Sequence, residues 1–206
     1  VAASTSLWRK WDGLNLSPVS TKIGLRRKFG LGPYAPRLDL SFEGGKRFAA
    51  TAERSSNFAI STLSFSQRLT PVLSWHLSAD LERQDAERHV FSTTRHMFRI
   101  GADYDITPDL RISLNAAEGR GDLVSWCRVS WPEFTGKNPW FDEIFGDDWF
   151  PYQSVNRITS AQLSLAYALG DRSTLAATLD LSRSAGTGKR HIYYNEIINV
   201  QYIHAF

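Results

Sequence analysis

His76 and Ser78 form a pair whose residue types and spacing could support covalent catalysis. They lie two positions apart in a stretch, Leu73 to Glu82, where apolar and polar residues alternate strictly. Residues two apart on a β-strand share a face, and an imidazole beside a hydroxyl is the arrangement that activates serine for nucleophilic attack. No Asn or Asp that would orient His76 can be assigned on a neighbouring strand from the sequence. A chance pair of polar residues on one face is therefore the alternative interpretation.

Charged residues of both signs recur along the same polar faces. The 206-residue chain has 24 Lys and Arg, 21 Asp and Glu, and a formal net charge of +3, without a basic block or stripe. The sequence therefore predicts no nucleic-acid partner. If the polar faces line a narrow interior, the charges should pair, because unpaired charges there are costly. The predicted members of this lumen network are Arg37, Asp39, Asp80, Glu82, Arg95, Arg99, Asp103, Arg111 and Asp180. A narrow charged conduit is the alternative.

The longest predicted connection, at about residues 119–155, is unusually aromatic. Loops of this length are either functional or disordered, and this one is too aromatic for disorder. It could fold over the mouth of a barrel as a lid, lie on the outer leaflet as an interfacial segment, or contact a partner protein, and a lid or a partner contact is favoured. The residues predicted to do so are Trp131, Trp140, Phe141, Phe145 and Trp149. Its acidic residues are more simply explained as solvated side chains than as calcium ligands, so the sequence predicts no metal and no cofactor. Cys127, the only cysteine, cannot form an internal disulfide.

The elements that must position these residues are β-strands. No stretch approaches the roughly 18 apolar residues of a membrane-spanning helix, whereas alternation with a period of two recurs along the chain. A change of apolar phase near Thr62 predicts a β-bulge. The predicted strands cover about residues 19–29, 37–43, 57–69, 73–85, 92–106, 110–120, 156–169, 173–184 and 191–206.

The predicted connections differ in length between the two ends of the strands. Tight turns at 70–72, 107–109 and 170–172 fall on one side, and longer loops at about 44–56, 85–92, 119–153 and 184–190 fall on the other. A soluble sandwich or lipocalin-like barrel has no reason to sort its loops this way, but a transmembrane β-barrel does. Aromatic residues that an interfacial girdle would use occur near the tight turns, at Phe29, Trp75, Tyr104, Tyr167 and Phe206.

The C-terminal strand carries a family resemblance. The segment IINVQYIHAF places Tyr202 and the terminal Phe206 on one face, and it looks like the closing strand of bacterial outer-membrane β-barrels. The turns in YDITPDLRISL and YALGDRSTLAATL are similar to periplasmic turns of that class. The resemblance implies an antiparallel transmembrane β-barrel in the outer membrane of a Gram-negative bacterium. It also implies contact with outer-membrane lipid and lipopolysaccharide, and recognition of Tyr202 and Phe206 by the barrel assembly machinery.

Single-chain bacterial barrels usually have an even number of strands. Nine predicted strands therefore imply either a tenth within Thr5 to Asp12, which gives the barrel of about ten strands that we expect, or the C-terminal part of a larger barrel. We expect residues 1–18 to form an N-terminal segment and 19–206 the barrel. The first residues, from Val1, have no signal-peptide pattern, so a mature form or a fragment is expected. The leading expectation for function is a non-catalytic structural or interaction barrel in a surface assembly. The alternatives are a narrow porin-like channel for small solutes and, third, a lipid-modifying enzyme using His76 and Ser78.

Overall fold

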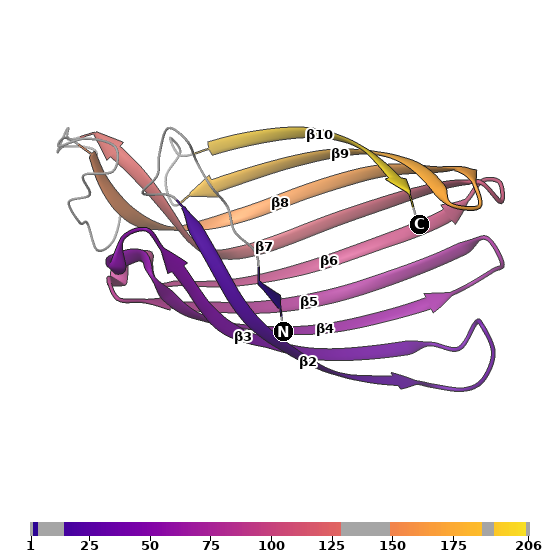
Figure 1. The fold of residues 1–206 in the computed structure, drawn as a ribbon, viewed down its shortest axis with the longest axis horizontal. Coiled ribbons are helices and arrows are strands. Elements are labelled where there is room, and N and C mark those ends of the chain that lie inside the picture. Colours follow the sequence, from indigo (N-terminus) through magenta and orange to yellow (C-terminus); the bar gives the residue numbers. More distant parts are fainter. Residues whose placement is uncertain (1, 4–14, 129–148, 187–191, 205–206) are drawn as a thin grey trace.

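The computed structural model describes residues 2–3, 15–128, 149–186 and 192–204. These residues form one antiparallel sheet in which strands adjacent in sequence are adjacent in space (Figure 1). Two single 3-10 turns, η2 (Ala52–Arg54) and η3 (His89–Phe91), connect strands at one end. The strands are β1 (Ala2–Ala3), β2 (Leu16–Lys28), β3 (Arg37–Ala49), β4 (Ser56–Arg68), β5 (Leu73–Ala86), β6 (Thr93–Asp105), β7 (Leu110–Arg128), β8 (Trp149–Gly170), β9 (Ser173–Gly186) and β10 (Ile192–His204). The prediction of an all-β antiparallel fold is confirmed.

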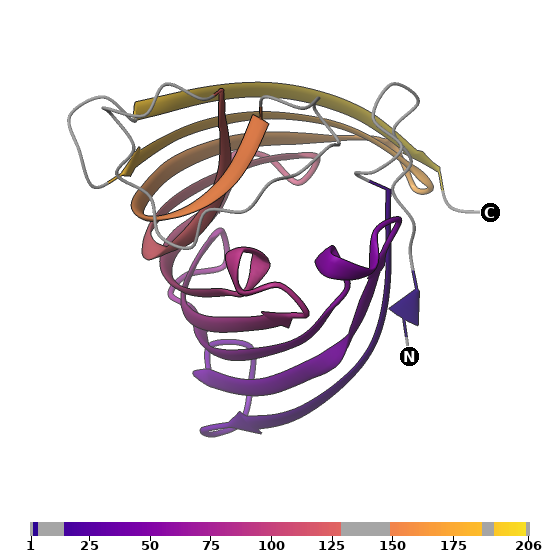
Figure 2. The same ribbon diagram turned by 90° about the vertical axis from the view of Figure 1, so that its left-hand side faces the viewer.

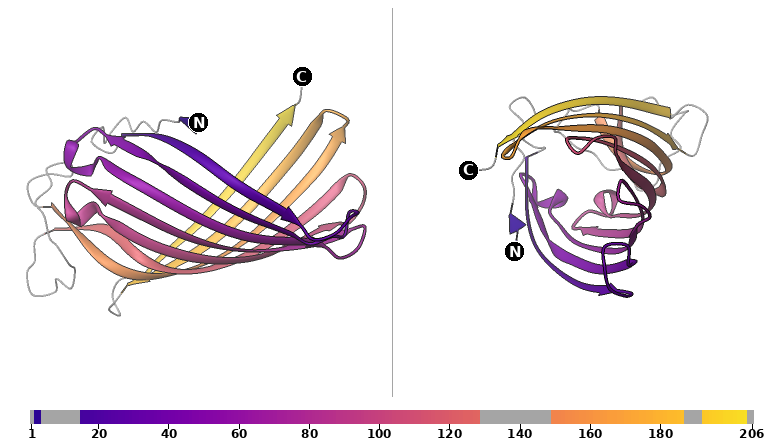
Figure 3. Two further views of the ribbon diagram at one scale, coloured as in Figure 1. Left: turned by 90° about the horizontal axis from the view of Figure 1, so that it is seen from below. Right: turned by 90° about the vertical axis from the view of Figure 1, so that its right-hand side faces the viewer.

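The sheet curls across its width into a deep trough, with η2 and η3 inside the curve (Figure 2). The view from the opposite end in Figure 3 shows the same curvature. The long edge strands β2 and β10 do not pair with each other in the part of the chain that the structure describes. β1 covers only a short stretch of the β2 edge, through Ala2 opposite Ser20 and Ala3 opposite Val19. No helix within the described ranges is long and apolar enough to cross a membrane.

The register separates an apolar face from a polar face. Apolar residues oppose apolar residues across strand pairs, as in Leu40 opposite Leu63 and Leu163 opposite Leu179. On the other face, Arg47 of β3 reaches across β4 to form an ion pair with Glu82 of β5. Side chains can meet over an intervening strand most readily where the sheet curves towards them, so the polar face is concave and the apolar face convex. Convex residues are strongly exposed; Leu114, for example, is 61% exposed.

Several strands are longer than their alternation predicts. β3 continues through Gly44 and Gly45 to Ala49, although the two glycines interrupt the pattern of side chains. Gly45 must lack a side chain, because a Cβ there would overlap the backbone carbonyl oxygen of Val19 on β2. β7 likewise extends to Arg128, and β8 begins at Trp149. The predicted loops at 44–56 and 119–155 were therefore wrong in extent, because much of each is strand.

The predicted β-bulge near Thr62 is wrong. β4 pairs with β3 and β5 in continuous register, and its apolar residues simply change faces. Phe58 lies on the concave face and Phe65 on the convex face, by the residues they oppose. Phe58 can lie on the polar face because the guanidinium of Arg47 covers its ring, 4.4 Å from the centroid. The Phe58 side chain is buried as a result. The phase change therefore marks an apolar site within the trough.

Two of the three tight turns, those at 70–72 and 107–109, share a local hydrogen-bond arrangement. Thr70 Oγ1 accepts hydrogen bonds from the backbone N–H groups of Val72 and Leu73, and Thr107 Oγ1 accepts the equivalent pair from Asp109 and Leu110. Both threonines precede a proline, so each turn is fixed by its own side chain and a restricted φ.

The predicted division between short and long connections is only partly correct. The connection at 29–36, on the same end as the tight turns, is longer than the connections at 50–55 and 87–92 on the other end. The connections predicted at 44–56 and 85–92 are shorter than expected, because β3 and β5 extend into those ranges. The candidate first strand in Thr5 to Asp12 lies outside the described residues.

Candidate functional site

The concave face carries Arg–carboxylate–Arg triads at the short-turn end. Asp39 forms ion pairs with Arg26 and Arg37, the latter with 2.9 Å between Arg37 Nε and Asp39 Oδ2. Asp105 pairs with Arg111 at 2.6 Å and with Arg68, from across β5, at 3.6 Å. Each carboxylate is shared by two guanidinium groups, so each triad retains a positive charge.

A polar chain crosses the middle of the trough. His76 of β5 meets Asn115 of β7 over Gly101 of β6, with 2.9 Å between imidazole Nε2 and Oδ1. Asn115 Nδ2 donates to Gln162 Oε1 at 3.3 Å, and Gln162 Nε2 lies 3.5 Å from Asp180 Oδ2. The chain therefore joins the concave faces of β5, β7, β8 and β9. Only a glycine on β6 leaves room for it, because a Cβ on Gly101 would overlap both Asn115 Oδ1 and His76 Nε2.

Asp103 lies beside this chain and accepts hydrogen bonds from two hydroxyls. Ser113 Oγ donates at 2.6 Å and Ser74 Oγ at 3.4 Å, while His76 Nδ1 is 3.9 Å away. Asp80, further along the same face of β5, forms an ion pair with Arg99 of β6. The middle of the trough therefore contains neutral hydrogen-bonding groups as well as matched charges.

The predicted catalytic pair is not assembled as a nucleophile and base. His76 and Ser78 do share the concave face of β5, since they oppose Ser66 and Ser64 on β4. Within the described residues, however, Ser78 makes no hydrogen bond with His76, and the imidazole is held by Asn115 instead. Asn115 is the orienting residue that sequence reasoning could not assign, because it lies two strands away and meets His76 only where Gly101 permits it.

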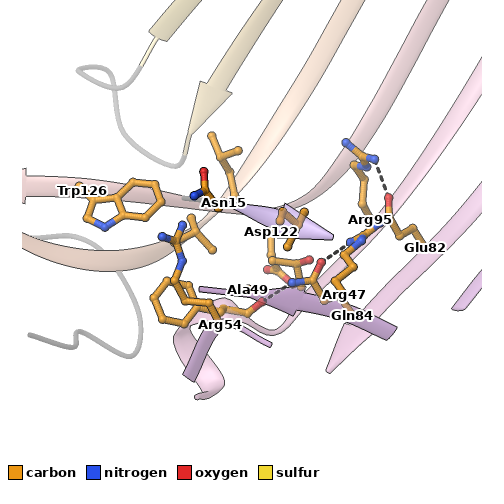
Figure 4. Close-up of a pocket in the computed structure, with 14 residues that line it drawn as sticks. Asn15, Arg47, Ala49, Arg54, Glu82, Gln84, Arg95, Asp122 and Trp126 are labelled. Carbon is orange, nitrogen blue, oxygen red and sulfur yellow. Dashed lines mark hydrogen bonds and ion pairs between the residues drawn. The ribbon is translucent and has the colours of Figure 1, made fainter. Parts of the chain in front are cut away.

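A cavity of about 450 Å³ opens at the other end of the trough (Figure 4). Its polar wall is a third triad: Glu82 forms ion pairs with Arg47 at 2.7 Å and with Arg95 at 2.5 Å. Arg47 also donates to Gln84 Oε1, and Gln84 Nε2 donates to the backbone carbonyl of Phe91 at 3.2 Å. Glu82 is only 14% exposed, whereas Arg95 is 45% exposed at the cavity surface.

The opposite wall of this cavity is aromatic. The Arg54 guanidinium lies 5.3 Å from the ring centroid of Phe91 and 5.5 Å from that of Trp126. Asp122, also in the wall, accepts a hydrogen bond from the Thr94 backbone N–H at 2.9 Å. The cavity thus combines three arginines with two carboxylates and aromatic surface, a lining suited to a small anionic solute.

The structure places the nine predicted network residues on one face but in separate groups. Arg37 and Asp39 lie at the short-turn end of β3, Arg111 joins Asp105 at the same end, and Arg95 and Glu82 line the cavity. Arg99 pairs with Asp80, whereas Asp103 and Asp180 contact neutral side chains and not an arginine among the described residues.

The sequence reasoning missed Arg47 as a member of the network, because the glycines before it placed it in a predicted loop. Continuing the two-residue period through Gly44 and Gly45 would have put Arg47 on the face of Asp39. Asn115 and Gln162 were missed because neutral amides carry no charge pattern. No signal in one sequence gives the strand register that brings them together.

The predicted loop and assembly residues are only partly described. Trp149 is the first residue of β8, so it begins a strand and does not lie in a loop. Tyr202 opposes Leu175 on the convex side, and its hydroxyl is 3.1 Å from Ser173 Oγ. The remaining predicted residues lie outside the described part of the chain: Trp131, Trp140, Phe141, Phe145 and Phe206.

A comparison with protein-family models finds no match to this chain, and a comparison with curated protein sequences finds none either. Within the described residues, no group of His, Cys, Asp and Glu side chains is arranged to hold a metal ion. The two faces of the sheet and the contacts within the trough are therefore the features that bear on function.

Proposed function

We propose that this chain forms the wall of a transmembrane β-barrel in a bacterial outer membrane, with the convex face in lipid and the concave face around a polar interior. The observation that carries this proposal is the contrast between the faces. Apolar side chains cover the convex face from β2 to β10 and are largely exposed, whereas ion pairs and amides fill the concave face. A band of exposed apolar residues this wide is unfavourable in water and is the lipid-facing pattern of outer-membrane barrels.

Aromatic residues support the placement of one membrane boundary. Trp75, Tyr104 and Tyr167 lie on the convex face near the tight turns, opposite Ala102, Leu73 and Leu110. Trp and Tyr side chains are enriched where hydrocarbon meets headgroups. We assign this end to the periplasm and the cavity end to the cell surface. The proposal also requires the edges of β2 and β10 to be paired in the membrane, because unpaired backbone groups are not tolerated in hydrocarbon.

We further propose that the interior passes small anionic solutes. Each of the three triads holds two arginines around one carboxylate, at the short-turn end and in the cavity. Several of these guanidinium groups are about half exposed, as a hydrated wall requires and a packed plug does not; Arg111, for example, is 54% exposed. Rings of Arg and Lys favour anions in pores.

Ion selectivity in a planar bilayer tests this proposal. The refolded full-length chain should form steady pores whose reversal potential in a salt gradient reports anion preference. Substituting Arg37→Gln together with Arg111→Gln should lower that preference, whereas Arg172→Gln, in the exposed β8–β9 turn, serves as a matched control and should not. Cation preference in the native chain, or equal effects of all these variants, would reject an anion pathway.

A structural or interaction barrel is the second candidate. Arg47 and Arg68 each form an ion pair across an intervening strand, which ties non-adjacent strands together and stiffens the wall. Protein that inserts fully into bilayers and stays electrically silent would favour this candidate over the channel.

A further inference from the structure

A row of basic residues, four arginines and one histidine, crosses the convex face on five consecutive strands. Apolar residues make up most of the convex side, and the side chains of this row are all exposed. The row consists of Arg83 on β5, His96 on β6, Arg120 on β7, Arg157 on β8 and Arg183 on β9. The register aligns them: His96 lies directly opposite Arg120, and Arg120 directly opposite Arg157.

Like charges placed directly opposite each other on a sheet are destabilising. Neighbouring carboxylates offset this repulsion within the row only in part. Glu118 pairs with Arg157 at 2.7 Å, and Asp85 pairs with Arg83 at 3.2 Å. Within the described residues, Arg120 and Arg183 form no ion pair. The row therefore carries four guanidinium groups, of which Arg83 and Arg157 are each paired with a carboxylate and Arg120 and Arg183 are not, among the described residues.

The row borders the apolar band on the same strands. Moving from the row towards the short turns, the next convex side chains are Phe98 on β6 and Leu181 on β9, whereas on β7 and β8 Glu118 and Thr159 precede Ala116 and Ala161. A molecule whose apolar chains cover these residues would place its headgroup against the row. The short-turn border of the same band carries aromatic residues instead of a comparable cationic row.

We propose that this row binds the phosphate groups of an anionic lipid headgroup in the leaflet at the cavity end. The inference rests on the membrane-spanning placement proposed above. Guanidinium groups bind phosphate oxygens through paired, charge-assisted hydrogen bonds. A phosphate bridging Arg120 and Arg157 would give Arg120, which has no ion pair among the described residues, an anionic partner, while Arg157 is already paired with Glu118. Continuity between the row and the apolar band favours a lipid over a free ion as the source of that phosphate.

Lipid binding by the full-length chain tests this site. Protein in a neutral detergent would be titrated with phosphatidic acid or, separately, phosphatidylcholine of the same acyl chains, and bound lipids counted by native mass spectrometry. The test variant is Arg120→Gln with Arg157→Gln. The matched control is Arg27→Gln with Arg172→Gln, which removes the same charge at the opposite end of the strands. Arg183→Gln provides a second, milder test variant.

We expect the native chain and the control to prefer phosphatidic acid, and the test variant to bind it about tenfold more weakly, given the strength of cation–lipid attraction at a membrane surface. Arg183→Gln should weaken binding less. Equal binding of both lipids by the native chain, or no difference between the test and control variants, would overturn the site. Competition by inorganic phosphate at a concentration equal to that of the lipid would assign the site to the free ion and also overturn the lipid proposal.

Insertion of the native chain into phosphatidylcholine vesicles, followed by protease protection, is measured in parallel. Failure to insert would contradict the membrane-spanning proposal. Insertion without selective phosphatidic acid binding would contradict only the phosphate site.

Discussion

Gly101 shows how one residue without a side chain can organise a polar centre. It lies between His76 and Asn115, which contact each other over the backbone of β6. A larger residue would separate them and leave the Asn115–Gln162 contact without its neighbour. The trough is therefore joined across its middle by hydrogen bonds that depend on this glycine more than on any charge.

Replacing Gly101 should destabilise the fold. In Gly101→Ala the new Cβ would overlap Asn115 Oδ1 and His76 Nε2, and overpacking of this kind costs about 1–3 kcal/mol. The urea midpoint of the protein in detergent micelles should fall accordingly. Gly24→Ala is the control, because its Cβ would make only ordinary contacts, at 3.5 Å from Leu40 O. Adding Asn115→Ala to Gly101→Ala should recover part of the loss, and a double variant as unstable as the sum of the two singles would contradict the steric explanation.

Charge changes at Glu82 and Arg47 should move ion selectivity in opposite directions. Glu82→Gln leaves Arg47 and Arg95 without their shared carboxylate and should raise the anion-to-cation permeability ratio, whereas Arg47→Gln should lower it. Each variant should change the permeability ratio about two- to fivefold, which corresponds to roughly 0.5–1 kcal/mol per charge. Reversal potentials measured in the same salt gradient would report both. Shifts in the same direction would mean that these residues affect selectivity through the stability of the fold and not through the electrostatic field along the proposed pathway.

At the scale of single elements, alternation predicts which residues share a face, but it fails where side chains are missing or exchange faces. Because Gly44 and Gly45 have no side chains, the alternation stopped before them, and the second half of β3, which includes Arg47, was predicted as a loop. Phe58 suggested a bulge because an apolar residue falls on the polar face there. Its burial beneath Arg47 of the neighbouring strand explains this position, and the sequence does not show that contact. Strand identity and polar face could therefore be predicted from local sequence. The Asn115 contact could not, because it requires the register of β5, β6 and β7.

The two faces of β4 should respond differently to a new charge. Leu63 lies on the convex face in mid-strand, and Leu63→Arg should oppose membrane insertion by about 2–4 kcal/mol, the cost of arginine on the lipid side at the midplane. Thr62 lies on the concave face opposite Asp80, so Thr62→Arg should be tolerated. The folded fraction in phosphatidylcholine vesicles, followed by urea titration, gives the comparison. Equal tolerance of both variants would argue that neither face of β4 contacts hydrocarbon.

At the scale of the whole molecule, curvature gives the two faces different surroundings. Bending brings concave side chains together across intervening strands and spreads the convex apolar side chains apart. The same bending leaves β2 and β10 as separate edges in the described residues. A soluble protein would have to cover both the edges and the apolar face, whereas a bilayer accounts for the apolar face and requires only that the edges be paired.

Spin-label accessibility along β8 reports whether lipid covers the convex face. Single labels at Gln162, Leu163, Ser164 and Leu165, introduced into a Cys127→Ser background and reconstituted in bilayers, would be probed with oxygen and with a water-soluble nickel complex. If the convex face lies in lipid, the accessibilities should alternate strictly, with Leu163 and Leu165 more accessible to oxygen and Gln162 and Ser164 more accessible to nickel. Nickel access at all four positions, or alternation in the opposite phase, would contradict it.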